Sequence, residues 1–151
     1  MGNLHTLDHL GLIEIWPVEI VHCHLFTYGR DVVVFTRQNG YLGPVSGEVE
    51  IGETYIDAAV REVFEETGLR VRPDMVIMTD HTFSGVSPKG KPIFGFTCFT
   101  FLPRSFDPAQ FRLNGELITY KILSLDEAIK LLAREGMPEA KKGLHMLLMG
   151  I

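Results

Sequence analysis

Apolar residues along this chain fall mainly into short runs that are typical of β-strands. The flanking turns contain Gly, Asn and Asp, which favour chain reversal. The strand-like runs cover residues 18–29, 31–38, 69–83, 91–103 and 116–124. Between the second and third runs, residues 39–53 are rich in Gly and Pro, which predicts a loop. A second loop is predicted at 84–91.

The spacing of apolar residues becomes helical after residue 54. Thr54 is a suitable N-cap, Asp57 is its capping-box partner, and Gly68 follows where a left-handed C-terminal cap is expected. Two later segments, 125–136 and 139–150, predict further helices. Strands that alternate with helices in this way predict an α/β fold, with helices covering a mixed sheet. We expect one domain over residues 1–151.

Composition and charge exclude several classes of protein. Of the 151 residues, 46% are hydrophobic and 22% are charged, as in ordinary globular proteins. The net charge of −5 and the lack of a Lys/Arg-rich block argue against a nucleic-acid binder. No apolar run approaches the ~18 residues of a membrane-spanning helix. The first residues do not resemble a secretory signal, so we expect a cytoplasmic protein.

The cysteines and histidines of the predicted strands show no metal-binding pattern. Cys23 and Cys98 lie in apolar runs, which predicts reduced core residues. His22, His24 and His81 have strand-like spacing and no Cys or His partner at zinc-ligand spacing. We therefore expect these histidines to be structural or to line a substrate site.

The segment 47–69 concentrates negative charge on the first predicted helix. Glu62, Glu65 and Glu66 are spaced i, i+3 and i+4, so they share one side of the helix, and the apolar residues around Val63 fall on the other. Like charges at this spacing cost a few tenths of a kcal/mol per pair. Such a face is usually solvated, but only Arg61 is close enough to offset the repulsion. A divalent cation such as Mg²⁺ would turn this repulsion into attraction and would bridge the acids to phosphate.

The same spacing resembles the Nudix box at every fixed position. The matching residues are Gly47, then Glu53 after five residues, Arg61-Glu62-Val63 after seven more, Glu65-Glu66, and Gly68-Leu69. The match spans 23 residues. The chain is therefore identified as a member of the Nudix hydrolase family. The resemblance implies an α/β/α sandwich with a mixed sheet, and cleavage of a phosphoanhydride bond by water.

The resemblance also implies a metal site. In the family, the acids that match Glu62, Glu65 and Glu66 bind a divalent metal, usually Mg²⁺, with Mn²⁺ as a substitute. The backbone carbonyl of the glycine that matches Gly47 often adds a ligand. One of the acids also serves as general base in some members. Which carboxylate has that role varies in the family, and the resemblance leaves it open here.

Supporting roles follow for three further residues. The arginine that matches Arg61 orients a glutamate through a salt bridge. The acid that matches Glu53 supports that network or the nucleophilic water. Glu116 precedes a late strand that leads into a helix, as does an acid in many relatives, so it is a candidate metal ligand or base. The alternative for Glu116 is an ordinary loop carboxylate.

Four residues are candidate contacts to the substrate. Arg37 ends the second strand, where relatives often place a basic residue near phosphate. Phe83, Lys89 and Lys91 are expected in the loop before the fourth strand, where a ring stacks on a base and lysines bind phosphate. The alternative for all four is a solvated surface position.

The expected substrate is a (deoxy)nucleoside or pterin triphosphate, cleaved to a monophosphate and pyrophosphate. Val45-Ser46-Gly47 replaces the common Pro-Gly-Gly and is more like nucleoside and dihydroneopterin triphosphate pyrophosphohydrolases. Alternatives are dinucleoside polyphosphates, nucleotide sugars, a non-catalytic nucleotide-binding module, and an isomerase of isopentenyl diphosphate. The expected partner is a small molecule, with no nucleic acid or membrane. Homodimers are frequent in the family, so a homodimer is also among the expectations.

Overall fold

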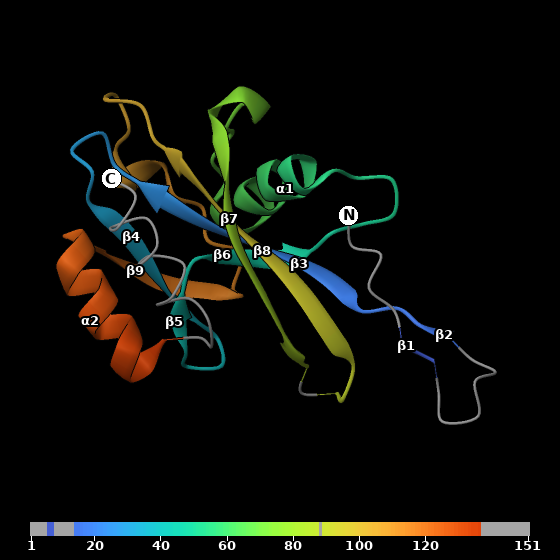
Figure 1. Cartoon of the computed structure of the whole chain (residues 1–151). Coiled ribbons are helices and arrows are strands. Elements are labelled where there is room, and N and C mark those ends of the chain that lie inside the picture. Colours follow the sequence, from blue (N-terminus) through green and yellow to red (C-terminus); the bar gives the residue numbers. More distant parts are fainter. Residues whose placement is uncertain (1–5, 8–13, 88, 137–151) are drawn as a thin grey trace.

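The structure is a computed structural model that describes residues 6–7, 14–87 and 89–136 (Figure 1). A helix predicted at 139–150 lies outside the described residues. The elements, in chain order, are β1 Thr6–Leu7, β2 Glu14–Ile15, β3 Val18–Phe26, β4 Val32–Arg37, β5 Leu42–Gly43, β6 Val45–Glu48, α1 Tyr55–Thr67, η1 Pro73–Met75, β7 Val76–Val86, β8 Pro92–Phe101, η2 Pro108–Gln110, β9 Leu117–Leu123 and α2 Leu125–Glu135.

Strand β3 lies at the centre of a seven-stranded mixed sheet. One edge of β3 pairs antiparallel with both β4 and β6, and the other edge pairs parallel with β8. Strand β7 pairs with β8 at one margin, while β5 and β9 pair with β4 on the other side. The mixed sheet expected from the sequence is therefore confirmed.

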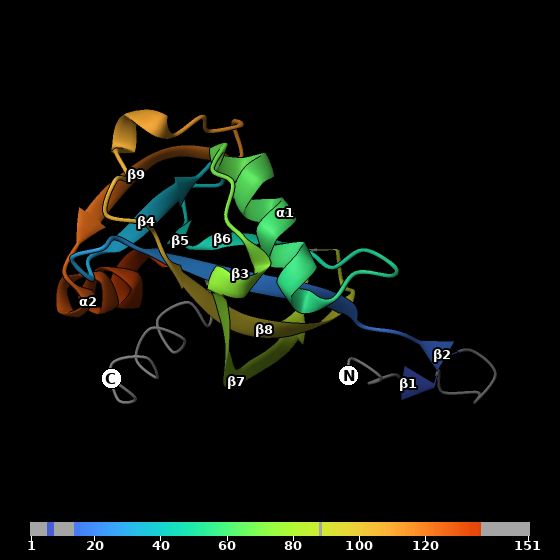
Figure 2. The same ribbon diagram turned by 90° about the horizontal axis from the view of Figure 1, so that it is seen from above.

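Helices cover opposite faces of this sheet, which confirms the α/β/α arrangement (Figure 2). Val21, Cys23 and Leu25 of β3 share a core with Val63 of α1. Phe26 belongs to a second core on the other face, where it is grouped with buried residues of α2. Adjacent residues of a strand point to opposite faces, so one strand contributes to both cores. No helix among the described residues is long and apolar enough to cross a membrane.

Three predictions about local structure were wrong. Residues 39–53 are not only a loop, because they contain β5 and β6. Strand β6 pairs with β3, with Val45 opposite Cys23, and Gly-rich composition conceals such a non-local pairing. The predicted strand over 69–83 starts later, at Val76, because Pro73 opens a 3₁₀ turn. That strand then continues to Val86, so Phe83 lies in a strand and not in a loop.

Helix α1 begins and ends where the sequence indicated. The Thr54 side chain accepts a hydrogen bond from the Asp57 N–H, the Asp57 side chain accepts one from the Thr54 N–H, and Gly68 caps the C-terminus at φ 79°. Burial differs among the acids of this helix. Glu62 and Glu66 are buried, whereas Glu65 is exposed. The backbone of β6 lies against both buried acids, and helical periodicity does not report that contact.

The cysteines are buried as predicted, and two of the histidines are buried as well. Cys23 and Cys98 are opposite each other on β3 and β8, are fully buried and carry free thiols. Their mutual hydrogen bond, followed by burial, raises the pKa of Cys23. His22 and His24 are 3% and 1% exposed, and burial lowers the pKa of each to about 3. Both histidines are therefore neutral at physiological pH.

Candidate active site

Arg61 lies in the middle of α1, at the centre of an acidic cluster. Its Nε lies 2.8 Å from Glu53, and its Nη1 lies 2.7 Å from Glu62 and 3.3 Å from Glu65. Its Nη2 donates to the Glu48 carbonyl at 2.8 Å, which attaches the helix to the end of β6. These contacts, first the hydrogen bond to Glu53, raise the pKa of Arg61 and lower that of Glu53. The guanidinium therefore holds three carboxylates that would otherwise repel one another.

Gly47 gives Glu62 the space to lie against the backbone of β6. A Cβ atom at position 47 would collide with the Glu62 carboxylate, so a larger residue requires that side chain to move. Glu62 is 9% exposed, and this burial raises its pKa against the opposing effect of Arg61. The role of the Gly47 carbonyl as a metal ligand stays a prediction. The close approach of the Glu62 carboxylate to the backbone at position 47 explains why a glycine is present.

Gly47→Ala is expected to weaken metal binding by about 10- to 100-fold, the usual effect of disturbing groups that orient a ligand. The added methyl must displace Glu62 from Arg61 or push β6 away from α1. Isothermal titration with Mg²⁺ measures the effect. Gly29→Ala is the matched control, because a Cβ there meets only the Thr27 hydroxyl at 3.9 Å. Equal Mg²⁺ affinity in both variants would contradict this account of Gly47.

A second group of charges surrounds Glu66 at the end of β4. Glu66 is 1% exposed, accepts a hydrogen bond from the Ser46 N–H at 3.1 Å, and lies 3.1 Å from Arg37 Nη2. The same Nη2 lies 3.7 Å from Glu116, which is exposed. Burial, and then the contact with Glu116, raises the pKa of Glu66 to about 7. The structure thus brings Arg37 and Glu116 to Glu66 of α1.

The raised pKa of Glu66 predicts a pH-dependent stability for the metal-free protein. Between about 4.5 and about 7 the folded protein keeps a proton that the unfolded chain has released, so the free energy of unfolding falls as pH rises. Glu66→Gln lacks this proton. Its stability relative to wild type is therefore expected to improve by roughly 2–3 kcal/mol across that range.

Urea unfolding in EDTA at several pH values measures this difference. Burial keeps His22 and His24 neutral, so below their usual pKa they make the free energy of unfolding rise with pH. Both histidines are present in wild type and in the variant, so this contribution cancels in the difference. A difference that does not vary with pH would contradict a raised Glu66 pKa.

The donor set fits a hard divalent cation. The described ion pairs join five carboxylates (Glu53, Glu62, Glu65, Glu66 and Glu116) to two guanidinium groups, those of Arg37 and Arg61. Carboxylate oxygens are the ligands that Mg²⁺ and Mn²⁺ prefer. Within the described part of the chain, no three acidic, His or Cys side chains converge into a ready metal cage. Glu62 and Glu65 are paired with Arg61.

Phe83, Lys89 and Lys91 are not near these acids. Phe83 is 7% exposed in β7, and its ring contacts His22 at 4.5 Å and packs over Gly95. Lys89 and Lys91 are exposed at the β7–β8 turn, which Figure 1 places away from α1. No described ion pair joins either lysine to the acidic cluster. Their role in substrate binding stays a prediction.

Several residues of the site contribute backbone atoms, which the sequence pattern does not reveal. The Ser46 N–H binds Glu66, the Glu48 carbonyl binds Arg61, and the Pro44 carbonyl accepts from Arg37 at 3.3 Å. Glu50 adds a looser ion pair with Arg61 at 3.8 Å. Any residue type supplies a backbone carbonyl, and nearly any supplies an N–H, so side-chain identity holds no signal of these contacts.

Comparisons with known proteins bear on the family and the fold of the chain. The family model of the NUDIX domain matches residues 18–146, and no curated protein sequence matches the chain. The E. coli dihydroneopterin triphosphate pyrophosphohydrolase is similar in structure, with a TM-score of 0.73 at 19% identity, covering 88% of this chain and 96% of that one.

Two further solved structures share the fold. A NUDIX hydrolase from Nitrosomonas europaea has a TM-score of 0.70 at 23% identity, covering 89% of this chain and 90% of that one. A C. elegans Ap4A hydrolase in a binary complex has a TM-score of 0.61 at 18% identity, covering 87% of this chain and 99% of that one. At these identities the likeness establishes the fold.

Proposed function

The chain belongs to the NUDIX family of phosphoanhydride hydrolases, and on this premise we propose that it cleaves a (deoxy)nucleoside or pterin triphosphate to a monophosphate and pyrophosphate. The observation that supports a catalytic site most directly is the buried Glu66, held between the Ser46 N–H and Arg37 and next to Glu116. Burial disfavours the ionised form of this carboxyl group. A bound divalent cation would stabilise the ionised form.

Each residue has a distinct part in the proposed reaction. Glu62, Glu65 and Glu66 would hold the divalent metal, which when bound would polarise the phosphate and lower the pKa of water. Glu116 adds a ligand or accepts the proton of the attacking water. Arg61 positions Glu62 and Glu65 through its ion pairs. Arg37 is within reach of Glu66 and Glu116, so it is placed to bind a phosphate oxygen beside the metal.

The choice of substrate class rests on the segment before α1. Val45-Ser46-Gly47 resembles nucleoside and dihydroneopterin triphosphate pyrophosphohydrolases, and a solved enzyme of the latter kind shares this fold. Ser46 needs only its N–H to hold Glu66, so the departure from Pro-Gly-Gly leaves the contact to this acid intact. Dinucleoside polyphosphates are the alternative, since an Ap4A hydrolase also shares the fold.

Two other functions have less support. A non-catalytic nucleotide-binding module has no need of a complete set of box carboxylates, and here all are present. An isomerase that uses a cysteine needs a thiol in contact with substrate. Cys23 and Cys98 are fully buried in the core shared with α1, and Cys23 has a raised pKa, so neither is available.

Turnover of a substrate panel with Mg²⁺ and with EDTA tests the proposal. The panel contains nucleoside triphosphates, dihydroneopterin triphosphate, dinucleoside polyphosphates and nucleotide sugars, and released pyrophosphate or phosphate is measured. We expect metal-dependent release of pyrophosphate from one triphosphate class, and none in EDTA. Turnover of only Ap4A or a nucleotide sugar would show that the proposed substrate class is wrong and that the cleaved compound belongs to the correct one. No turnover despite Mg²⁺ binding would favour a binding module.

A further inference from the structure

Two of the three asparagines of this chain are followed directly by glycine. Asn39-Gly40 lies in the turn after β4, and Asn114-Gly115 lies in the loop before β9. All four residues are exposed. Asparagine loses its side-chain amide most readily before glycine, because glycine has no side chain to hinder attack by its own nitrogen. Both pairs therefore have the sequence and the exposure that spontaneous deamidation requires.

Deamidation needs only water as a co-reactant. The glycine nitrogen attacks the asparagine Cγ and closes a five-membered succinimide ring. The amide nitrogen leaves as ammonia and takes with it the proton of the glycine N–H. Water then opens the ring at either of its carbonyls, which leaves an aspartate or an isoaspartate. One water is consumed and one ammonia is released, so the reaction is balanced without any other reagent.

The two asparagines have similar surroundings. The Asn39 side chain accepts a hydrogen bond from the Tyr41 N–H, and the Asn114 side chain accepts one from the Glu116 N–H, each at 3.0 Å. Such a donor polarises the carbonyl that is attacked, as the donors of an oxyanion hole do. The glycines that follow have φ values of 89° and 96°. Exposure, conformation and polarisation therefore do not distinguish the two positions.

The attacking nitrogens differ. The Gly40 N–H donates to the Arg37 carbonyl at 2.9 Å, whereas the Gly115 N–H makes no hydrogen bond with any residue that the structure describes. A nitrogen that attacks must first release its own hydrogen bond. The net strength of a backbone hydrogen bond corresponds to a rate that is roughly threefold to tenfold lower. This loss applies to Gly40 and not to Gly115.

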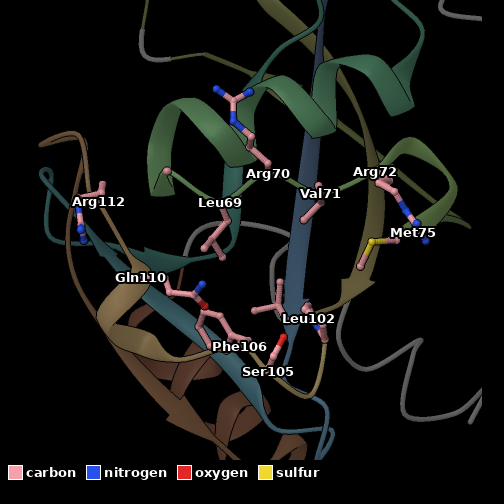
Figure 3. Close-up of a pocket in the computed structure, with 12 residues that line it drawn as sticks. Leu69, Arg70, Val71, Arg72, Met75, Leu102, Ser105, Phe106, Gln110 and Arg112 are labelled. Atoms are coloured by element: carbon pink, nitrogen blue, oxygen red, sulfur yellow. The ribbon is translucent and has the colours of Figure 1, made fainter.

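We propose that Asn114 is a deamidation site and that its reaction displaces Glu116. The loop is held at both ends. The Arg112 N–H donates to the Thr67 carbonyl at 2.7 Å, beside the hollow at the end of α1 that Figure 3 shows, and the Glu116 carbonyl accepts from the Gln38 N–H at 2.8 Å. Isoaspartate adds a methylene to the main chain between these anchors. The reaction also consumes the Asn114 side chain that holds the Glu116 N–H.

The effect of this displacement on activity rests on the proposed hydrolase function. Glu116 lies 3.7 Å from Arg37 Nη2 and is in contact with Glu66. The new carboxylate at position 114 adds negative charge two residues away from Glu116. Turnover is therefore expected to fall as isoaspartate accumulates. Deamidation itself does not depend on the function, because it requires only water and the conformation of the loop.

Peptide mapping of protein incubated at mildly alkaline pH tests the site. Trypsin separates the two positions, because Asn39 falls in peptide 38–61 and Asn114 in peptide 113–121. Mass spectrometry follows each deamidation with time, and an isoaspartyl methyltransferase labels the isoaspartate. The ratio of the Asn114 rate to the Asn39 rate is expected to be roughly threefold to tenfold higher in the folded protein than in guanidinium chloride.

The unfolded chain is the matched control, because it has the same neighbouring residues but neither glycine N–H is protected. An equal ratio of the two rates in the folded and unfolded chains would overturn the proposal. An Asn114 that stays intact in the folded protein while the unfolded chain reacts would overturn it as well.

The displacement of Glu116 has two readouts. Exchange of the Gln38 amide hydrogen, measured by NMR, should become faster after deamidation, because the Glu116 carbonyl holds that N–H. This readout needs no substrate, so it remains valid if the proposed function fails. Asn114→Gln, whose longer side chain closes the ring poorly, should keep its activity during incubation, and Asn39→Gln should lose activity as wild type does. Unchanged Gln38 exchange in deamidated protein would show that Glu116 is not displaced.

Discussion

Glu65→Gln/Glu66→Gln is expected to lower kcat by roughly 10³-fold or more, since positioned acid–base groups and metal ligands each contribute effects of this size. Glutamine keeps the shape of glutamate but removes the charge that attracts Mg²⁺. Mg²⁺ affinity should fall along with kcat. Initial rates on the best substrate of the panel, and titration with Mg²⁺, measure the two effects.

The fold should survive this double substitution. Glu65 is exposed, and after Glu66→Gln the amide oxygen of the new side chain would still accept the hydrogen bond from the Ser46 N–H. Asp126→Asn provides the control, because Asp126 is exposed on α2 and pairs with Lys130 at 3.1 Å, away from the acids. Full activity in the double variant would show that the metal site has been assigned to the wrong residues.

Arg61→Ala should produce the largest loss of stability at this site, about 3 kcal/mol in EDTA. The substitution leaves the partly buried Glu53 and Glu62 without their cation and frees the Glu48 carbonyl. Urea unfolding measures the loss. Saturating Mg²⁺ is expected to restore part of it, because the metal then neutralises the same carboxylates.

Two further variants serve as comparisons for the stability loss of Arg61→Ala. Lys130→Ala breaks an exposed ion pair on α2 and should cost less than about 1 kcal/mol. Arg61→Lys keeps the charge but loses the fork that contacts Glu53 with both Nε and Nη2, so an intermediate loss is expected. A loss in Arg61→Ala no greater than in Lys130→Ala would show that the acids are not held by this guanidinium.

Local signals in the sequence predicted the elements best where the structure is also local. The start and end of α1 follow from Thr54, Asp57 and Gly68, which all act within one or two turns of the helix. Strand β7 starts later than predicted for an equally local reason, the 3₁₀ turn at Pro73. Strand β6 was missed because its signal is its pairing with β3, a distant segment of the chain, and Gly47 obscured its strand character.

The sequence by itself identified the family, through the spacing from Gly47 to Leu69, and predicted which carboxylates supply the chemistry. Only the tertiary structure decided how they are held. It buried Glu66, turned Phe83 away from the acids, and brought Arg37 and Glu116 to the same glutamate. Burial and ion pairing depend on which distant segments cover a side chain, and the helical period of α1 has no information about that cover.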